Sequence, residues 1–222
     1  MSETHSTASA TSAGENSAPA GQAGAAGHLP LTEEQIRAAH IGELTPLVGL
    51  IQIVDYDPQW PRLFEREAER VRAALGARVL MLEHVGSTSV PGLAAKPRID
   101  MLLVLADTAD ESAYVPAMEG AGYKLHIREP DWYEHRLFKG PDTAVNLHVF
   151  SLGCLEIERM RLFRDWLRCN ADDRRLYEQT KRELARKKWK YGQNYADAKT
   201  AVVEEILARA QGNAEEEARK HA

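Results

Sequence analysis

Cysteine is scarce in this sequence of 222 residues, and long hydrophobic runs are missing altogether. The two cysteines, Cys154 and Cys169, have neither a metal-binding nor a redox spacing, which excludes a disulfide framework and suits a reducing compartment. No stretch reaches the roughly 18 apolar residues of a membrane-spanning helix, and no basic start leads into an apolar secretory signal. We therefore expect a cytoplasmic protein that makes no use of a membrane.

An excess of positive charge is missing as well. The formal net charge is −5 at pH 7, which argues against nucleic acid as a partner. Apolar residues make up 44% of the chain, a share that is typical of a globular protein with a sizeable core. The length then fits one domain of ordinary size.

Composition divides the chain into four parts. Residues 1–29 contain Ala, Gly, Ser and Thr with almost no large apolar side chain. We expect a disordered low-complexity tail there, because such a segment cannot offset its ordering entropy. Residues 30–49 predict a short helix, capped by Thr32, and a linker. Residues 50–210 form the predicted domain, and the Glu-rich residues 211–222 predict a frayed polar tail.

Hydrophobic periodicity predicts an α/β (α+β) fold with a mixed central sheet, flanking helices and a C-terminal helical layer. Short apolar runs predict strands at 50–54, 79–85, 99–105, 123–127, 133–138 and 145–150. Helical spacing predicts helices at 32–39, 61–75 and 111–119, and three more around 157–167, 176–184 and 195–206. In the first of these three, Arg161, Arg164 and Arg168 share one face, where Asp165 is expected to pair with an arginine such as Arg161 or Arg168.

The most informative feature is the loop from Gly86 to Pro97, which lies between two predicted strands and leads to Asp100. A Gly followed by Ser at a strand end lets the backbone approach a phosphate closely, and the hydroxyl and nearby amides can donate to it. Asp100 is the only polar residue of its strand, so its burial requires a cation or a hydrogen-bond donor. A magnesium ion would supply that compensation. The alternative is a Ser/Thr-rich turn in which Asp100 caps a backbone amide.

Other polar residues lie where a ligand could use them. His84 precedes Gly86 by two and Arg98 precedes Asp100 by two, so each pair is expected to share a face of its strand. Arg136 interrupts one later strand, and Asn146 and His148 alternate on another. Each of these could equally be structural, since satisfied histidines and surface arginines are common. The candidate ligand-binding residues are His84, Gly86, Ser87, Thr88, Lys96, Arg98, Arg136 and Asn146.

The stretch from His84 to Asp100, HVGSTSVPGLAAKPRID, closely resembles the signature of the GrpB family, a branch of the nucleotidyltransferase superfamily. Further blocks of the sequence are similar to that family at 55–61, 146–150, 163–168, 177–181 and 195–199. The resemblance covers about residues 50–210. It implies a nucleotidyltransferase-like fold, with Gly86 and Ser87 as the phosphate turn and Asp100 as a carboxylate for magnesium. The superfamily's usual Asp-x-Asp pair is replaced by Asp100-Met101-Leu102, and Asn146 and His148 stand where a third carboxylate is often found.

Three functions are consistent with these residues. In the first, the protein transfers a nucleotidyl group: Asp100 holds magnesium, Ser87 and Lys96 grip phosphate, and His148 is a catalytic general base. In the second, it binds a nucleotide or another phosphorylated ligand without chemistry. The resemblance then points to a coenzyme A precursor, because similar domains follow dephospho-coenzyme A kinase in some bacteria. In the third, the C-terminal helices bind a protein partner.

Overall fold

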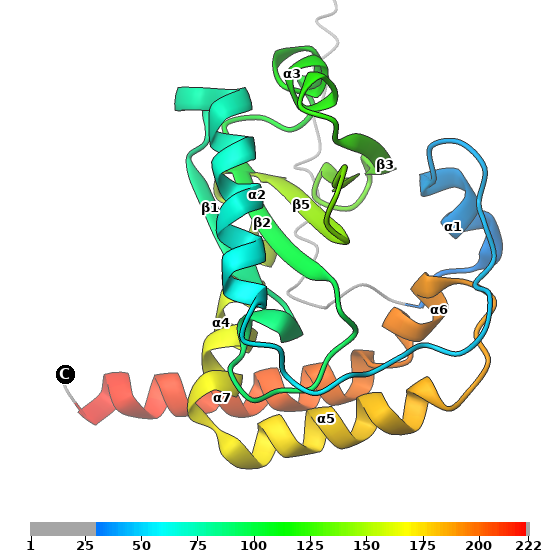
Figure 1. Cartoon of the computed structure of the whole chain (residues 1–222). Coiled ribbons are helices and arrows are strands. Elements are labelled where there is room, and N and C mark those ends of the chain that lie inside the picture. The colour runs from blue at the N-terminus through cyan, green and yellow to red at the C-terminus, as the bar shows by residue number, and fades with distance from the viewer. Residues whose placement is uncertain (1–29, 221–222) are drawn as a thin grey trace, which may run out of the picture.

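The computed structural model of the protein describes residues 30–220, so the tail predicted over residues 1–29 lies outside the described residues. Five strands form one mixed sheet in the order β1-β2-β5-β4-β3 (Figure 1). They are β1 (Met81–Val85), β2 (Ile99–Leu105), β3 (Lys124–Glu129), β4 (His135–Lys139) and β5 (Val145–Ser151). The central pair β2 and β5 is parallel, and the other three pairs are antiparallel.

The register of the sheet separates polar from apolar residues. Asn146 of β5 lies between Asp100 of β2 and Lys139 of β4. Because side chains directly opposite each other point to the same face, these three polar residues form one row. On the other face, the next row is Met101, Leu147 and Phe138, all fully buried. Strand alternation therefore creates one apolar face and one face that is polar near the starts of β2 and β5.

Helices α2 (Trp60–Leu75) and α3 (Val115–Gly120) cover the apolar face. Trp60, Phe64 and Val71 of α2 share one core cluster with Met101 and Leu147 of the sheet. Their spacing follows the helical period, so α2 has one buried apolar stripe. Glu67 is the buried charged residue of this helix, and its carboxylate accepts hydrogen bonds from Tyr123 and Thr143.

The opposite face has two different covers. Helix α4 (Leu155–Cys169) packs Ile157 against Val85, Leu102 and Phe150. Helices α5 (Ala171–Ala185) and α7 (Thr200–Lys220) pack behind α4 and form the predicted C-terminal layer. The polar end of this face is covered instead by α1 (Glu33–Ala39), the segment that follows it, and α6 (Gly192–Asp197). Short 3₁₀ turns occur at Gly76–Arg78, Ser87–Ser89 and Glu111–Ala113.

The mixed α+β architecture predicted from periodicity is confirmed, and four local predictions need correction. Residues 50–54 form no strand of the sheet: one bridge joins Val54 to Ala95, and Ile51 packs against helical residues. The helix expected at 111–119 is split, because Pro116 lacks an N–H and fits only the first turn of α3. The last predicted helix is divided into α6 and α7. Helix α7 continues past Gln211 to Lys220, supported by exposed Glu–Lys and Glu–Arg pairs at i,i+4 spacing.

Within residues 30–220, every helix is too short or too polar to span a membrane.

The packing of the apolar face can be tested at Phe138, which is fully buried and contacts the ring of Tyr114 edge-on. Phe138→Ala is expected to lower the free energy of unfolding by about 3–5 kcal/mol, because it removes buried apolar area and leaves a cavity. Leu152→Ala is the control, because Leu152 is 68% exposed, and its effect should stay within about 0.5 kcal/mol. Urea denaturation measures both, and equal losses would contradict this description of the core.

Candidate functional site

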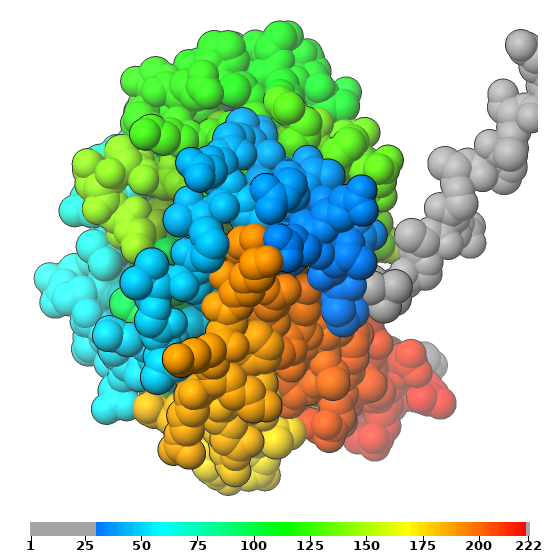
Figure 2. Space-filling model, turned by 90° about the vertical axis from the view of Figure 1, so that its right-hand side faces the viewer, coloured from blue at the N-terminus to red at the C-terminus, as the bar shows by residue number. Residues whose placement is uncertain are grey.

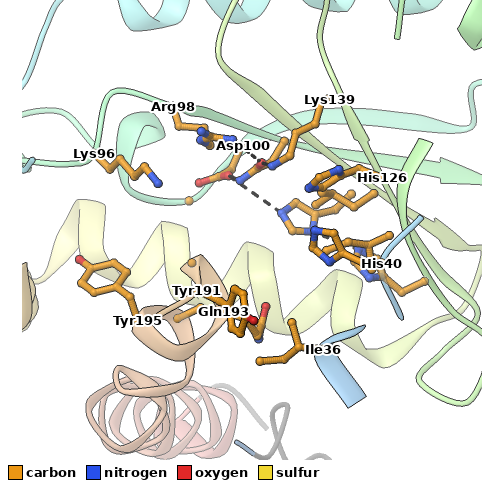
Figure 3. Close-up of a pocket in the computed structure, with 18 of the residues that line it drawn as sticks. Ile36, His40, Lys96, Arg98, Asp100, His126, Lys139, Tyr191, Gln193 and Tyr195 are labelled. Carbon is orange, nitrogen blue, oxygen red and sulfur yellow. Dashed lines mark hydrogen bonds and ion pairs between the residues drawn. The ribbon is translucent and has the colours of Figure 1, made fainter. Parts of the chain in front are cut away.

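A cavity of about 620 Å³ lies over the polar end of the sheet (Figure 3). Its floor is formed by β2, β4 and β5, and one side by the loop from Gly86 to Arg98. Helix α6 contributes Gln193 and Tyr195, and the segment around α1 contributes Ile36 and His40. Residues that are far apart in the sequence thus enclose a volume suitable for a small molecule.

The N-terminal segment is held to the rest of the wall at both ends. Lys190 and the hydroxyl of Tyr191 both contact the carboxylate of Glu33. Farther along, the backbone N–H of Ile41 donates to the carbonyl of His126 on β3 at 3.0 Å. Figure 2 shows this segment, in blue, lying across the surface between α6 and the upper part of the sheet. Residues 36–47 therefore close one side of the cavity.

Asn146 is the junction of the polar row. Its Nδ2 donates to Oδ1 of Asp100 at 2.8 Å. Its Oδ1 accepts from Nη1 of Arg98 at 3.2 Å and from Nζ of Lys139. The two cations fix the orientation of the amide, because only a carbonyl oxygen can accept from them. Asp100 thus has a donor supplied by a side chain, where the alternative interpretation of the loop predicts a backbone amide.

Positive charge dominates the surroundings of Asp100. The cations that line the cavity are Lys96, Arg98, Lys139, Lys181 and Lys199. Burial lowers the pKa of Lys139 to about 7, and the nearby charge of Arg98 acts in the same direction. Burial also lowers the pKa of Lys181 to about 7, again assisted by a neighbouring cation, Lys199. Burial raises the pKa of Asp100, against the opposing effects of its Asn146 hydrogen bond and the nearby cations.

Two buried polar atoms of the cavity wall have no hydrogen-bond partner among the described residues. They are Nε of Arg98 and the hydroxyl oxygen of Tyr195. A buried donor without a partner costs about 1–3 kcal/mol. Both atoms lie beneath the surface of the wall and are inaccessible to solvent.

The turn that follows β1 brings the backbone against Asp100. Gly86 has φ of +68°, and a Cβ at this position would lie 2.6 Å from Oδ2 of Asp100. Ser89 closes the turn by donating from Oγ to the carbonyl of Gly86 at 2.6 Å. Thr88 donates to the carbonyl of Arg98 at 3.2 Å, which ties the two ends of the loop together. Glycine is therefore required both by the backbone conformation and by the close approach of the carboxylate.

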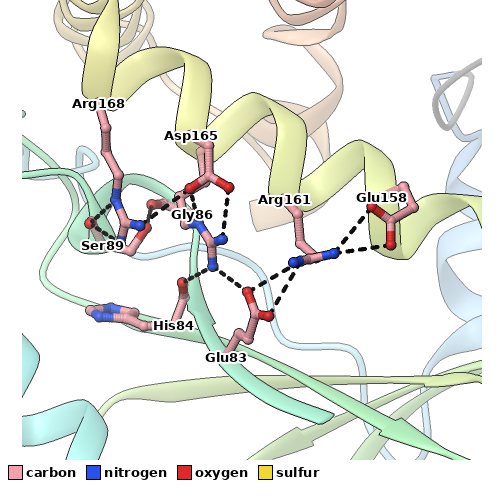
Figure 4. Close-up of polar contacts among 9 residues, drawn as sticks. Glu83, His84, Gly86, Ser89, Glu158, Arg161, Asp165 and Arg168 are labelled. Carbon is pink, nitrogen blue, oxygen red and sulfur yellow. Dashed lines mark hydrogen bonds and ion pairs between the residues drawn. The ribbon is translucent and has the colours of Figure 1, made fainter.

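Helix α4 braces this turn from outside the cavity (Figure 4). Arg164 donates to the carbonyl of His84 at 3.1 Å and to the carboxylate of Glu83 at 2.5 Å. Arg168 donates to the carbonyl of Ser89 at 2.9 and 3.1 Å. Asp165 pairs with both arginines, so the predicted pairing with Arg168 is confirmed. The arginines predicted to share one helical face therefore hold the two ends of the turn.

Eight of the residues singled out in the sequence lie together in the cavity wall: Gly86, Ser87, Thr88, Lys96, Arg98, Asp100, Asn146 and His148. His84 and Arg136 lie elsewhere. His84 stacks on Phe64 of α2 with ring centroids 4.9 Å apart, and burial lowers its pKa to about 4. Arg136 pairs with Glu111 and Glu134. The expected shared face of His84 and Gly86 is wrong because the positive φ of Gly86 breaks the alternation of the strand.

Several cavity residues were missed by sequence reasoning. Lys181 and Lys199 fall in the two blocks 177–181 and 195–199, whose similarity to the family indicated only closing helices. Lys181 donates its hydrogen bond to the carbonyl of Ala94, a contact across 87 positions of the sequence. Lys139, His135 and Glu129 lie on β3 and β4. Every second residue of a strand lies on the same face, so His135 and Lys139 share a face if the strand expected at 133–138 is extended by one residue. This alternation was the signal that could have indicated Lys139.

Of three carboxylates considered as magnesium ligands, Asp100 lines the cavity, whereas Glu83 and Glu134 do not. Magnesium prefers about six oxygen ligands, with one or more carboxylates among them. Asp100 has cationic neighbours, and within residues 30–220 no three His, Cys, Asp or Glu side chains are grouped as a metal site. Glu83 pairs with Arg161 and Arg164, and Glu134 pairs with Arg136. Neither carboxylate is therefore available as a second ligand.

The close approach at Gly86 generates a test against a matched glycine. Gly76 also has a positive φ, of +55°, but a Cβ there would meet nothing within 4 Å. Gly76→Ala should cost about 1–2 kcal/mol of folding free energy, the penalty for a side chain in this conformation. Gly86→Ala should cost about 1–3 kcal/mol more, because it overpacks against Asp100. Thermal or urea unfolding measures both variants, and equal costs would show that Asp100 does not press on the turn.

Comparison with known proteins supports the resemblance seen in the sequence. Residues 50–209 match the family described as GrpB protein. A UPF0157 protein of Halalkalibacterium halodurans is 58% identical over 181 residues, which cover 82% of this chain and 93% of that protein. The crystal structure of the conserved protein GrpB from Enterococcus faecalis is 30% identical, with a TM-score of 0.62 over 73% of this chain and 98% of that chain. A dephospho-CoA kinase of Mycolicibacterium paratuberculosis is 28% identical over 158 residues, which cover 60% of this chain and 39% of the kinase. The sequence motifs, the matched range and these relatives agree, and the chain belongs to the GrpB family.

Proposed function

We propose that this protein binds a small phosphorylated molecule, a nucleotide or a coenzyme A precursor, in the cavity beside Asp100. The observation that carries the proposal is the cluster of half-buried cations around the carboxylate of Asp100. Lys96, Arg98 and Lys139 would contact the phosphate, and the turn at Gly86 and Ser87 would lie beside it. A cytoplasmic setting, where such metabolites are present, is part of the proposal.

The electrostatics of the cavity support an anionic ligand. Bringing several cations together away from water is unfavourable, and lysines respond by losing their protons. The lowered pKa values of Lys139 and Lys181 express this cost. A phosphate would restore their positive charge and would accept hydrogen bonds from them.

We also propose that the protein is related to the nucleotidyltransferase superfamily. A glycine turn followed by an aspartate supports that relationship, although Leu102 stands where the superfamily usually has a second carboxylate. We therefore propose phosphate recognition by side-chain charge, with any magnesium arriving on the ligand. The similarity to part of a dephospho-CoA kinase favours a coenzyme A precursor among the phosphorylated compounds.

One observation favours chemistry in addition to binding. Nε2 of His148 lies 4.0 Å from Oδ1 of Asp100 at the floor of the cavity. A histidine in this position could act as the general base of a nucleotidyl transfer. A protein partner on the C-terminal helices stays a prediction, and its signature would be a complex that survives mutation of Ser87 and Asp100.

Ligand binding can be tested by thermal shift with nucleoside triphosphates, coenzyme A precursors and inorganic phosphate, each with and without magnesium. A ligand at about 100 times its Kd should stabilise the fold by about 2.7 kcal/mol. Lys139→Met should weaken binding by about ten- to a hundredfold, because a hydrogen bond to a charged group contributes about 1.5–3 kcal/mol. Lys124→Met is the control, since Lys124 is an exposed lysine on β3. The proposal would be contradicted if no compound raised the melting temperature. It would also be contradicted if Lys139→Met and Lys124→Met weakened binding equally.

Proton uptake provides a second test of the same contacts. Since the pKa of Lys139 is about 7 in the free protein, this lysine is mostly uncharged at about pH 8, and a phosphate that stabilises its charged form must bind together with a proton. The affinity for the phosphorylated ligand should therefore fall as the pH rises through about 7. Calorimetry in buffers of different ionisation enthalpy measures the uptake, which should decrease in Lys139→Met. Binding without proton uptake in the wild type would show that the lysine does not contact the anion.

A further inference from the structure

A chain of polar side chains crosses three strands and ends at the cavity floor. Oε2 of Glu129 lies 2.7 Å from Nδ1 of His135. Nε2 of His135 lies 3.1 Å from Nδ1 of His148, and the two rings stack with 19° between their planes. The remaining nitrogen, Nε2 of His148, faces Oδ1 of Asp100 at 4.0 Å. Strand register produces this line, since Glu129 of β3 is opposite His135 of β4.

Hydrogen-bonding chemistry assigns the protons of this chain when both rings are neutral and Glu129 is ionised. An ionised carboxylate only accepts hydrogen bonds, so Nδ1 of His135 must carry the proton that it shares with Glu129. In a neutral ring, Nε2 of His135 is then an acceptor, and its donor is the Nδ1 proton of His148. A neutral His148 protonated at Nδ1 has no proton at Nε2. Two acceptors, this nitrogen and the Asp100 carboxylate, consequently face each other at the cavity floor.

We infer that Glu129 and His135 are positioning residues that hold His148 in its Nδ1-protonated form, so that the bare Nε2 accepts a hydrogen bond from a hydroxyl or water entering the cavity. This inference deepens the proposed function and rests on it only for the nature of the ligand. That ligand would be a phosphorylated compound with a hydroxyl close to its phosphate. If Nε2 takes the proton fully, the oxygen keeps the electron pair of the broken O–H bond. The positive charge on His148 then lies between Asp100 on one side and Glu129, through His135, on the other.

The charged groups around His148 are compatible with a neutral ring at physiological pH. Those facing it are Asp100 on β2, Glu129 on β3, and His135 and Lys139 on β4. Burial lowers the pKa of His148 well below its ordinary value, assisted by His135 and Lys139 and opposed by Glu129. Across the cavity, the side chain of His40, which follows α1, lines the wall.

The inference can be tested without any ligand, by long-range ¹H–¹⁵N NMR of the histidine rings in the full chain. At neutral pH, His148 should give a protonated-type shift at Nδ1 and an unprotonated-type shift at Nε2. Assignment comes from the loss of signals in His148→Gln. A wild-type spectrum with the proton on Nε2 of His148 would overturn the inference, whether or not the cavity binds a phosphorylated compound.

Three variants test the chain of positioning residues. Glu129→Leu and His135→Phe should each shift His148 toward the Nε2-protonated form that free neutral histidine favours. Glu129→Gln should preserve the wild-type form, because its amide oxygen can still accept from Nδ1 of His135. His40→Gln is the control, since His40 lines the same cavity outside the chain, and it should leave the signals of His148 unchanged. Backbone spectra confirm folding of each variant, and an unaltered His148 in folded His135→Phe would refute the positioning role.

Discussion

The hydrogen bond from Asn146 to Asp100 is the contact on which the site depends. It exists because the parallel pairing of β2 and β5 places the two residues directly opposite each other. A carboxylate at 100 and a carboxylate at 146 would repel each other, whereas an amide donates to Asp100 and still presents an oxygen to Arg98 and Lys139. One amide therefore links the carboxylate of Asp100 to the cations around it.

This arrangement differs in kind from a site built on metal ions. A divalent ion concentrates positive charge at one point and requires carboxylates to hold it. Here the positive charge is spread over side chains from the loop, β4, α5 and the segment before α7. Such a cavity can contact several oxygens of an anion at once, and the protonation of its lysines responds to the occupant.

Local features of the structure were predictable from the sequence, and long-range ones were not. The range of β2 agrees with its predicted bounds because an apolar run between polar residues has one simple interpretation. The cavity residues from Gly86 to Asp100 were recognisable because they are contiguous. Lys181 was not, since its burial under Ala94 exists only after α5 packs against the loop. Residues 50–54 have the composition of a strand, but Ile51 and Ile53 pack against residues of α5 and α6, and Leu50 and Val54 are exposed.

The wall contributed by α1 lies before residue 50, where the match to the family begins. Its contacts with the segment before α6 include the pair between Glu33 and Lys190, two side chains about half exposed to solvent. Exposed ion pairs contribute little to stability, so the buried Ile36 is the main anchor of this wall. Detaching one short helix costs far less than unfolding the sheet. For the proposed ligand, this peripheral segment would therefore set the residence time, while the residues of the sheet and the loop would provide the recognition.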